Sequence, residues 1–256
     1  MKITSLLKLP QASNIKDLDN PSATRLHAEI INSKGFLKKL YVDFYRILKN
    51  KLPESAKTIV ELGSGGGFIK EVIPSALTSD VLEVSGLDHV FSALNMPFED
   101  ASVDAFVMID VLHHIPDPEQ FFREADRCLI PDGKIIMIEP ANTPWSRFIY
   151  KNFHHEEFDL EAGWTLGASG PLSQANGAIP WIIFNRDRKK FLDCFPVFEI
   201  LEIKNHTPVR YLLSGGFTLR QLVPSWTYGF FKIVEHLISP AKNITGMFQT
   251  IEIKKT

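Results

Sequence analysis

The stretch Thr58-Ile59-Val60-Glu61-Leu62-Gly63-Ser64-Gly65-Gly66-Gly67-Phe68 decides the fold of this chain. Its β-branched and apolar start favours a buried strand, and its glycines let the backbone turn and approach a ligand closely. The glycines at 63, 65 and 67 do not have the G-x-G-x-x-G spacing of a dinucleotide-binding turn. Glu61 would repel a pyrophosphate but attract an ammonium group. The stretch therefore predicts a turn that binds a cationic ligand, and a tight turn without a ligand is the alternative.

A second acidic residue, Asp80, lies near the end of the next expected strand, residues 76–82. It follows Gly63 by 17 residues, close to the separation of about 20 at which an acid reaches a ribose in nucleotide-binding βαβ units. A carboxylate can accept hydrogen bonds from both cis hydroxyls, so Asp80 is the expected ribose ligand. An aspartate in a surface turn is the alternative. Residues 83–86 are too few for a crossover helix, so a shortened loop is expected to lead to a third strand at 87–91.

Residues 105–140 follow the order strand, loop, helix, turn, strand, which is typical of a parallel sheet unit. The first of these strands, residues 105–109, is followed directly by Asp110. Ligands of open α/β sheets lie at the carboxyl ends of the strands, so Asp110 is expected at the binding edge. The helix is expected to begin with Asp117 as its N-cap and with Gln120 completing a capping box.

The same region resembles the class I S-adenosylmethionine (SAM) dependent methyltransferases. Residues 61–67 are similar to the acid-x-G-x-G-x-G motif I of that class. Met96-Pro97-Phe98, Leu112-His113-His114 and Pro131-Asp132-Gly133 are similar to sequence blocks of its type 11 subset, which is related to quinone-biosynthesis methyltransferases. The resemblance covers residues 57–141. It implies an α/β fold with a doubly wound, mostly parallel seven-stranded sheet in which strand 7 is antiparallel between strands 5 and 6.

The resemblance also implies SAM as the cofactor. The residues expected to bind it lie on the loops at the carboxyl ends of the strands: Glu61, Gly63, Ser64, Gly65, Asp80, Val81, Ser92, Ala93, Leu94, Met96 and Asp110. Glu61 is expected to steer the methionine end. Ser92 stands where the family usually has an acid that accepts from the adenine amino group. Adenine is therefore expected to rest on the backbone of Ala93 and Leu94 and against Met96.

His113 and His114 directly follow the expected binding edge, and either could take a proton from an acceptor hydroxyl because the pKa of histidine is close to working pH. The structural alternative is that one of them packs the turn while the other is exposed. Methyl transfer from a sulfonium depends mainly on alignment and desolvation, so a strong base is not essential. The run at residues 154–157, two histidines and two glutamates, has no third ligand cluster at metal spacing, so no metal is predicted.

We expect one methyltransferase domain over residues 1–256. Within it, residues 22–52 are expected to form a helical cover, residues 57–140 the SAM-binding core, residues 141–195 an inserted lid or acceptor pocket, and residues 196–256 the last strands and helices. The insertion is rich in aromatic residues and glycine, and an extra packed layer is the alternative to a lid.

An apolar stripe near the C-terminus is expected to be buried, and its members are Trp226, Phe230, Val234 and Leu237. A membrane-surface or partner-binding face is the alternative. No run approaches the roughly 20 apolar residues of a membrane span, and residues 1–10 do not read as a signal peptide, so the protein is expected to be cytoplasmic. Cys128 and Cys194 are expected to be buried thiols.

The composition is that of an ordinary globular protein, with 45% hydrophobic and 23% charged residues and a net charge of −2. Such a small net charge provides no field that would attract nucleic acid. The segment 110–113 also lacks the N-P-P-Y-like turn of nucleic-acid methyltransferases. The sequence therefore predicts methyl transfer to a small or glycosylated metabolite, with O-methylation favoured. A catalytically silent SAM-binding partner protein is the alternative, and the oligomeric state is not predicted.

Overall fold

The computed structural model describes residues 7–9, 19–153, 156–167, 170 and 174–256. Within this part of the chain, a seven-stranded sheet has the order β3-β2-β1-β4-β5-β7-β6. The strands are β1 (Ile59–Glu61), β2 (Ala76–Asp80), β3 (His89–Val90), β4 (Val103–Ile109), β5 (Leu129–Pro140), β6 (Phe198–His206) and β7 (Phe248–Lys255). β7 is antiparallel between β5 and β6, and the other pairings are parallel. The predicted sheet is confirmed.

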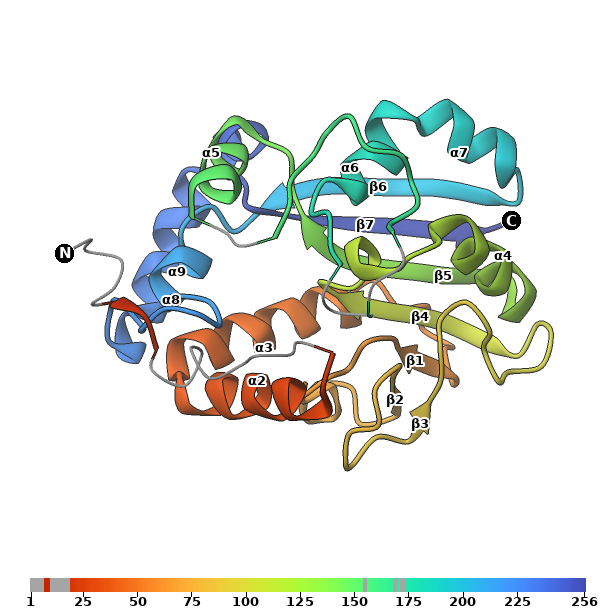
Figure 1. The fold of residues 1–256 in the computed structure, drawn as a ribbon, viewed down its shortest axis with the longest axis horizontal. Coiled ribbons are helices and arrows are strands. Elements are labelled where there is room, and N and C mark those ends of the chain that lie inside the picture. Colours follow the sequence, from red (N-terminus) through yellow and green to blue (C-terminus); the bar gives the residue numbers. More distant parts are fainter. Residues whose placement is uncertain (1–6, 10–18, 154–155, 168–169, 171–173) are drawn as a thin grey trace.

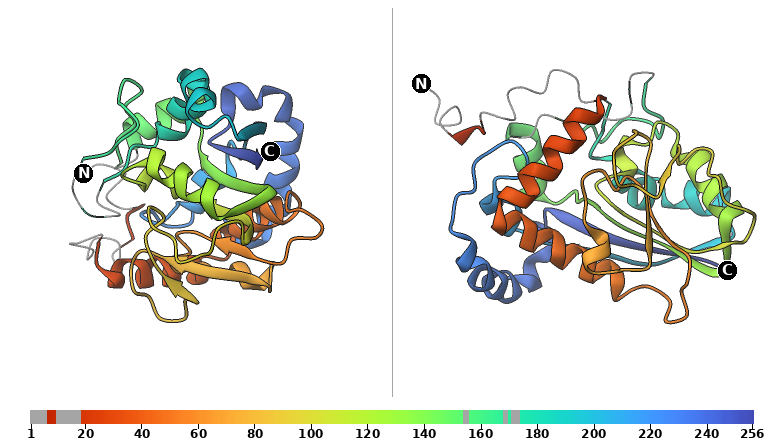
Figure 2. Two further views of the ribbon diagram at one scale, coloured as in Figure 1. Left: turned by 90° about the vertical axis from the view of Figure 1, so that its right-hand side faces the viewer. Right: turned by 90° about the horizontal axis from the view of Figure 1, so that it is seen from below.

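Helices surround the sheet. The longer ones are α2 (Pro21–Ser33), α3 (Gly35–Lys49), α4 (Pro118–Cys128), α5 (Pro144–Phe153), α7 (Arg188–Cys194) and α9 (Tyr228–Leu237). The shorter ones are η2 (Ile69–Glu71), η3 (Leu112–His114), α6 (Ile179–Trp181), the π-helical η4 (Ile182–Arg186), α8 (Arg210–Ser214), η5 (Ser225–Thr227), η6 (Ser239–Ala241) and α10 (Lys242–Thr245). Figure 1 shows α5, α8 and α9 beyond the end of the sheet toward which β4 and β5 point. Figure 2 shows α2 and α3 beside the sheet from two further directions.

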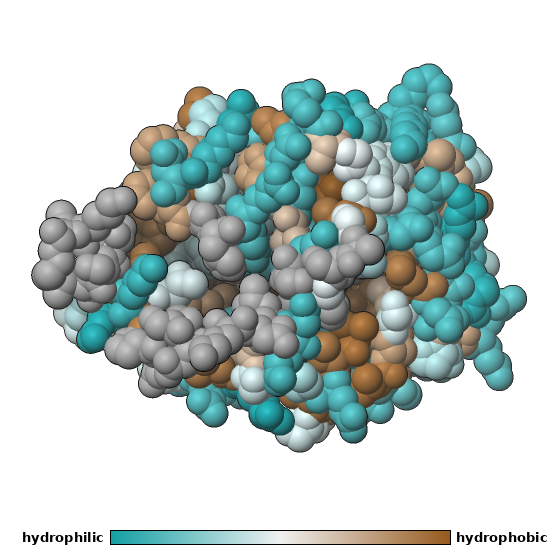
Figure 3. All heavy atoms as spheres, viewed as in Figure 1, coloured by the Kyte–Doolittle hydropathy of each residue, from teal (hydrophilic) through white to brown (hydrophobic). Residues whose placement is uncertain are grey.

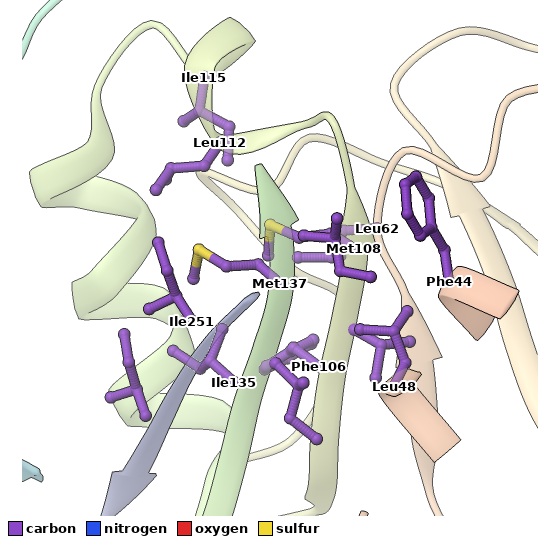
Figure 4. Packing of buried hydrophobic residues seen from close by; sticks show 14 of the residues in the cluster. Phe44, Leu48, Leu62, Phe106, Met108, Leu112, Ile115, Ile135, Met137 and Ile251 are labelled. Carbon is purple, nitrogen blue, oxygen red and sulfur yellow. The ribbon is translucent and has the colours of Figure 1, made fainter. Parts of the chain in front are cut away.

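The central strands are buried on both faces, as a parallel sheet covered by helices requires. Figure 4 shows Leu48 from α3 in one cluster with Phe106 from β4 and Met137 from β5. A second part of the core is aromatic: Phe122 of α4 contacts the rings of Phe184 and Phe191, at centroid distances of 6.0 and 5.0 Å. Residues 179–195 of the expected insertion therefore include a packed layer over α4.

A buried ion-pair network joins three helices, α3, α8 and α9. The guanidinium of Arg210 in α8 donates to Asp43 Oδ2 in α3 at 2.7 Å and to Glu235 Oε2 in α9 at 2.5 Å. Arg210 also donates to the hydroxyl of Tyr228. Removing one member would leave an uncompensated buried charge, so the network holds the three helices in one arrangement.

The predicted helix starts are only partly right. Asn20 caps α2: its Oδ1 accepts from the Ser22 N–H at 2.9 Å, and Pro21 occupies the first helical position. Asp117 caps α4 as predicted, with its Oδ1 3.0 Å from the Gln120 nitrogen. The side chain of Gln120 does not complete a capping box, because it donates to the carbonyl of Leu94 at 3.2 Å.

The prediction of a buried C-terminal stripe was wrong. Trp226, Phe230 and Leu237 are 81%, 63% and 72% exposed. The opposite face of α9 is the one that packs, because it carries Tyr228 and Glu235 into the Arg210 network. Cys128 is buried as expected, but Cys194 is exposed. No helix in the described residues is both long and apolar enough to cross a membrane.

We expect Phe122→Ala to lower the free energy of unfolding by about 3–5 kcal/mol, because it removes a fully buried ring from the aromatic part of the core. Urea denaturation monitored by tryptophan fluorescence measures this loss. Phe230→Ala is the matched control: since its ring is 63% exposed, we expect a change within about 0.5 kcal/mol. Equal losses in the two variants would contradict this account of the core.

Candidate active site

A cavity of about 770 Å³ lies at the carboxyl edge of the sheet. Its lining comes from three parts of the fold: the loops after β1, β2 and β3; helices α2 and α3; and the loop after β4 together with α5 and the segment that follows α8. Figure 3 shows the face seen in Figure 1, which is hollowed near its centre and partly bordered by apolar residues. The site expected from the sequence and the cavity in the structure therefore coincide at this edge.

The glycine turn forms the floor of one end of the cavity. Gly63 has a φ of 63°, and a Cβ there would lie 2.5 Å from a methyl group of Val111. A Cβ at Gly66 would lie 2.1 Å from the Cβ of Ala28 in α2. The turn is therefore held between the N-terminal cover and the loop after β4, where no side chain fits. Gly63, Ser64 and Gly65 line the cavity, as predicted for the cofactor turn.

Asp80, the predicted ribose ligand, lies at the end of β2 and lines the cavity. Its Oδ2 accepts from the Gly65 N–H at 2.8 Å, and its Oδ1 accepts from the Leu82 N–H at 2.9 Å. Each carboxylate oxygen has a second lone pair, so these bonds leave capacity for a bound hydroxyl. Asp80 therefore stabilises the glycine turn, and both Asp80 and the turn line the cavity.

Glu61 lines the cavity from the end of β1, and its side chain is buried. Its Oε2 has no hydrogen-bond partner among the described residues. Burial raises the pKa of Glu61 to about 7, although nearby Ser64 and Tyr45 oppose that rise. A buried carboxylate oxygen without a partner is costly, and a bound ammonium group would satisfy it. This orphaned oxygen fits the methionine end of SAM.

Most of the residues expected beside the adenine and ribose on this side lie in the cavity wall. Val81, Ser92, Ala93 and Leu94 all line the cavity. Met96 does not line it: its side chain is buried in the core, so the predicted contact between Met96 and adenine has no support in the structure. The side chain of Met96 is directed into the core because the residue lies beyond the turn that carries Ser92 to Leu94.

The loop after β4 carries the two predicted catalytic histidines. Asp110 begins this loop with a φ of 56°, a left-handed conformation that is uncommon for a non-glycine residue and is often found at functional sites. His113 and His114 follow in η3 and line the cavity. Their ring centroids are 4.3 Å apart. The structure therefore brings Asp110, His113 and His114 together at the same edge as Glu61.

Glu139 is a site residue that the sequence analysis missed. It is fully buried in β5, and its Oε2 lies 2.7 Å from His113 Nδ1. Its Oε1 accepts from the backbone N–H groups of Val111 and Leu112 at 2.9 and 2.7 Å. Glu139 therefore fixes both the loop and the His113 ring. The available signal was an acid at the end of a buried strand, the pattern that had identified Glu61 and Asp110.

Glu156 closes the other side of the histidine pair. One of its oxygens, Oε2, lies 3.6 Å from His113 Nε2, and the other, Oε1, lies 3.8 Å from His114 Nε2. His114 Nδ1 lies 3.3 Å from the carbonyl oxygen of Gln174. Of the run at residues 154–157, residues 154 and 155 lie outside the described part of the chain. Glu156 alone of that run has a defined place beside His113 and His114.

Burial and neighbouring charges shift the pKa values of the ionisable side chains in this cluster. Burial lowers the pKa of His113, but Glu139 and Glu156 outweigh burial and hold that pKa well above its usual value. Burial and the neighbouring His113 lower the pKa of His114 to about 4. Burial raises the pKa of Asp110 to about 8. At neutral pH His113 is therefore cationic, His114 is neutral and Asp110 is largely protonated.

Aromatic side chains form most of the remaining wall, and they include Tyr41, Tyr150, Phe153, Phe158, Tyr211 and Phe217. Phe153 is 62% exposed although it lines the cavity, so it lies at an opening. Its ring contacts Phe148, which stacks on Trp145 along α5. The cavity thus combines a polar end at the strand edge with a largely apolar wall.

The sequence is also similar to known methyltransferases in the region that forms the cofactor end of the cavity. A family model described as a methyltransferase domain matches residues 60–137. The ubiquinone/menaquinone biosynthesis C-methyltransferase of Bartonella tribocorum is 37% identical over 67 residues, which are 25% of this chain and 26% of that relative. This match therefore spans only about a quarter of the relative's length.

Two more distant relatives extend the similarity beyond the core. The ubiquinone biosynthesis O-methyltransferase of Xanthomonas oryzae pv. oryzae is 23% identical over 168 residues, which are 51% of this chain and 70% of that relative. A solved SAM-dependent methyltransferase of Thermotoga maritima, described as a possible histamine N-methyltransferase, has a TM-score of 0.54 and 17% identity. It covers 91% of this chain and 99% of its own, and it shows the same fold.

The sheet order with an antiparallel β7, the glycine turn after β1 and the match over residues 60–137 point to one family. SAM is the cofactor of that family, and the oxygen of Glu61 that has no partner among the described residues fits it, as does the carboxylate of Asp80 in the cavity wall. The chain has the fold of a SAM-dependent methyltransferase, and its residues 60–137 match the methyltransferase domain model.

Proposed function

We propose that this protein transfers the methyl group of SAM to a hydroxyl group, most simply a phenolic one, of a largely apolar small molecule. The observation that carries the proposal is a single cavity that joins the cofactor edge at Glu61 and Asp80 to the histidine cluster and the aromatic wall. Two buried oxygens that line this cavity, Glu61 Oε2 and Gln174 Oε1, have no hydrogen-bond partner among the described residues. A ligand at each end would satisfy them.

At the cofactor end, the chain's own residues hold and orient SAM. Glu61 pairs with the ammonium group, and Asp80 accepts from the ribose hydroxyls. Ser92, Ala93 and Leu94 border the base. When bound there, SAM supplies an electrophilic methyl group. The acceptor hydroxyl first loses its proton to solvent. Attack by the ionised oxygen then forms a C–O bond, breaks the C–S bond and leaves S-adenosylhomocysteine as the other product.

At the acceptor end, His113 contributes charge more than it contributes basicity. Its Nδ1 is bound to Glu139, so its Nε2 is directed toward Glu156 and the cavity. Because its pKa is held well above the usual value, the ring is cationic at neutral pH. A cation beside the acceptor oxygen favours the ionised phenolate, which is the better nucleophile. His114 completes this polar end of the cavity.

The aromatic wall supports an apolar acceptor. Tyr150 and Phe158 are buried and stack with ring centroids 5.1 Å apart, and Phe153 leads from the cavity to the surface. Aromatic walls with few polar groups are typical of sites for apolar ligands. The relative from Xanthomonas oryzae is described as a ubiquinone biosynthesis O-methyltransferase, which agrees with this acceptor chemistry.

The proposal is tested by turnover with SAM and three acceptor series: simple catechols, catechols with a prenyl tail, and aromatic amines. We expect methyl ethers from the catechols, with the lower KM for the prenylated ones, and mass spectrometry identifies the products. Methylation of the amines alone would contradict the proposed O-methylation and would show that the protein is an N-methyltransferase. SAM binding without turnover of any series would favour the silent SAM-binding protein.

Binding of SAM is expected to weaken about eightfold when the pH is lowered from 7.5 to 6.0. The pKa of Glu61 is about 7, so below that pH the carboxyl is neutral and must lose a proton before it can pair with the ammonium group. Isothermal titration calorimetry measures the dissociation constant at both values. Glu61→Gln should bind more weakly and show almost no pH dependence, and an unchanged dependence in that variant would rule out Glu61 as the titrating group.

The variant Glu139→Gln is expected to lower kcat with a catechol about hundredfold and to leave SAM affinity nearly unchanged. The glutamine keeps the size and one acceptor oxygen but removes the charge that holds His113 as a cation. Steady-state kinetics and calorimetry give the two quantities separately. A kcat equal to that of the wild type would show that the His113 charge has no part in the reaction.

A further inference from the structure

We propose that His113, His114 and Glu156 form a binding site for one divalent transition-metal ion at the acceptor end of the cavity. The three side chains can each offer one ligand atom, and these atoms all lie within 4.8 Å of one another. His113 and His114 come from the loop after β4, whereas Glu156 follows α5, so the fold assembles the set from two separate segments.

The spacing of the ligand atoms is close to that of a loaded site. The two Glu156 oxygens lie 3.6 Å from His113 Nε2 and 3.8 Å from His114 Nε2. Two ligands of a tetrahedral ion with bonds of about 2.1 Å are roughly 3.4 Å apart. These two distances involve different oxygens of Glu156, and with one ligand atom from each residue the three atoms lie within 4.8 Å of one another. Side-chain rotations that move these atoms by about 1 Å would bring them to ligand distance.

The hydrogen bonds of both rings prepare them as ligands. His113 Nδ1 is bound to Glu139, and His114 Nδ1 is bound to the Gln174 carbonyl. Each partner accepts a hydrogen bond from Nδ1–H, so the lone pair for a metal is on Nε2, which is the nitrogen that faces Glu156. Metal-ligating histidines almost always donate their other ring N–H to a carboxylate or a carbonyl in this way. Both histidines have such a partner.

The donor set selects the kind of ion. Two imidazoles with one carboxylate suit Zn²⁺, Fe²⁺, Co²⁺ or Mn²⁺ better than Mg²⁺ or Ca²⁺, which prefer oxygen ligands. Three protein ligands leave at least one coordination position open, and the cluster lines the cavity, so that position can be taken by an acceptor oxygen. The expectation from sequence that there is no metal was based on ligand spacing along the chain, and that spacing does not show that His113 and His114 lie beside Glu156.

The role of the ion in catalysis rests on the proposed function, whereas its binding does not. Coordination of the acceptor hydroxyl lowers its pKa, and the hydroxyl proton is released to solvent. The metal-bound oxygen then attacks the methyl group as already described, and the ion keeps its charge throughout. The ion replaces the proton on His113 Nε2, so it supplies the positive charge that the cationic ring supplies without metal.

The test is metal binding by the full chain, purified without a histidine tag and stripped with a chelator. Calorimetry with Zn²⁺ and absorption titration with Co²⁺ should both show one tight site per chain, and Mg²⁺ should not compete. We expect Glu156→Gln and His114→Gln to weaken this site at least tenfold, and Glu139→Gln to weaken it by a factor of about 10 to 100. His27→Gln, which changes a histidine of the same cavity outside the cluster, is the matched control and should bind like the wild type.

SAM binding, measured on every variant, shows that the protein is folded and keeps the two proposals separate. No Zn²⁺ or Co²⁺ binding by the wild type, or equal affinity in the cluster variants and the control, would overturn the metal site. SAM binding and methyl transfer would then stand unaffected. A metal site without methyl transfer to any acceptor would instead refute the proposed function and leave this inference intact.

Discussion

The structure depends on the burial of acidic side chains at the carboxyl edge of a parallel sheet. Glu61, Asp80, Asp110 and Glu139 stand at or next to the ends of β1, β2, β4 and β5. Burying a carboxylate is costly unless hydrogen bonds or an opposite charge offset the lost hydration. Hydrogen bonds from backbone N–H groups offset this cost for Asp80 and Glu139, and His113 offsets it further for Glu139. One oxygen of Glu61 has no hydrogen-bond partner in the part of the chain that the structure describes, which is why we regard it as a site for a cationic ligand.

The cover over this edge is held in place by charge as well as by apolar packing. Arg210 joins α3, α8 and α9 through Asp43 and Glu235, and the segment after α8 then lines the cavity. The close approach of Gly66 to Ala28 places α2 directly on the cofactor turn. The cavity is therefore enclosed by elements from both ends of the chain, which meet only in the folded protein.

The differences between expectation and structure have a common cause. The stripe of Trp226, Phe230 and Leu237 has helical spacing, but spacing cannot say which face of α9 packs, and the Arg210 network selects the face with Tyr228 and Glu235. The capping box failed because the Gln120 side chain found a nearer acceptor, the Leu94 carbonyl, on another loop. Local sequence patterns predict a contact reliably when both partners lie close together in the sequence. They fail when a distant segment offers a competing partner.

The sequence by itself determined the strand and glycine turn with its acid and the position of His113 and His114 after the fourth strand, because each depends on residues close together in the chain. The sheet order and the cofactor were implied by the resemblance of residues 57–141 to a known family. A strand, a turn and the acid beside it are set by local backbone preference and spacing. Only the tertiary structure decided that Glu139 supports His113 and that Glu156 faces both histidines, since those contacts join residues 26 and more than 40 positions apart. Such contacts depend on how strands and helices pack, and that packing is a property of the whole chain.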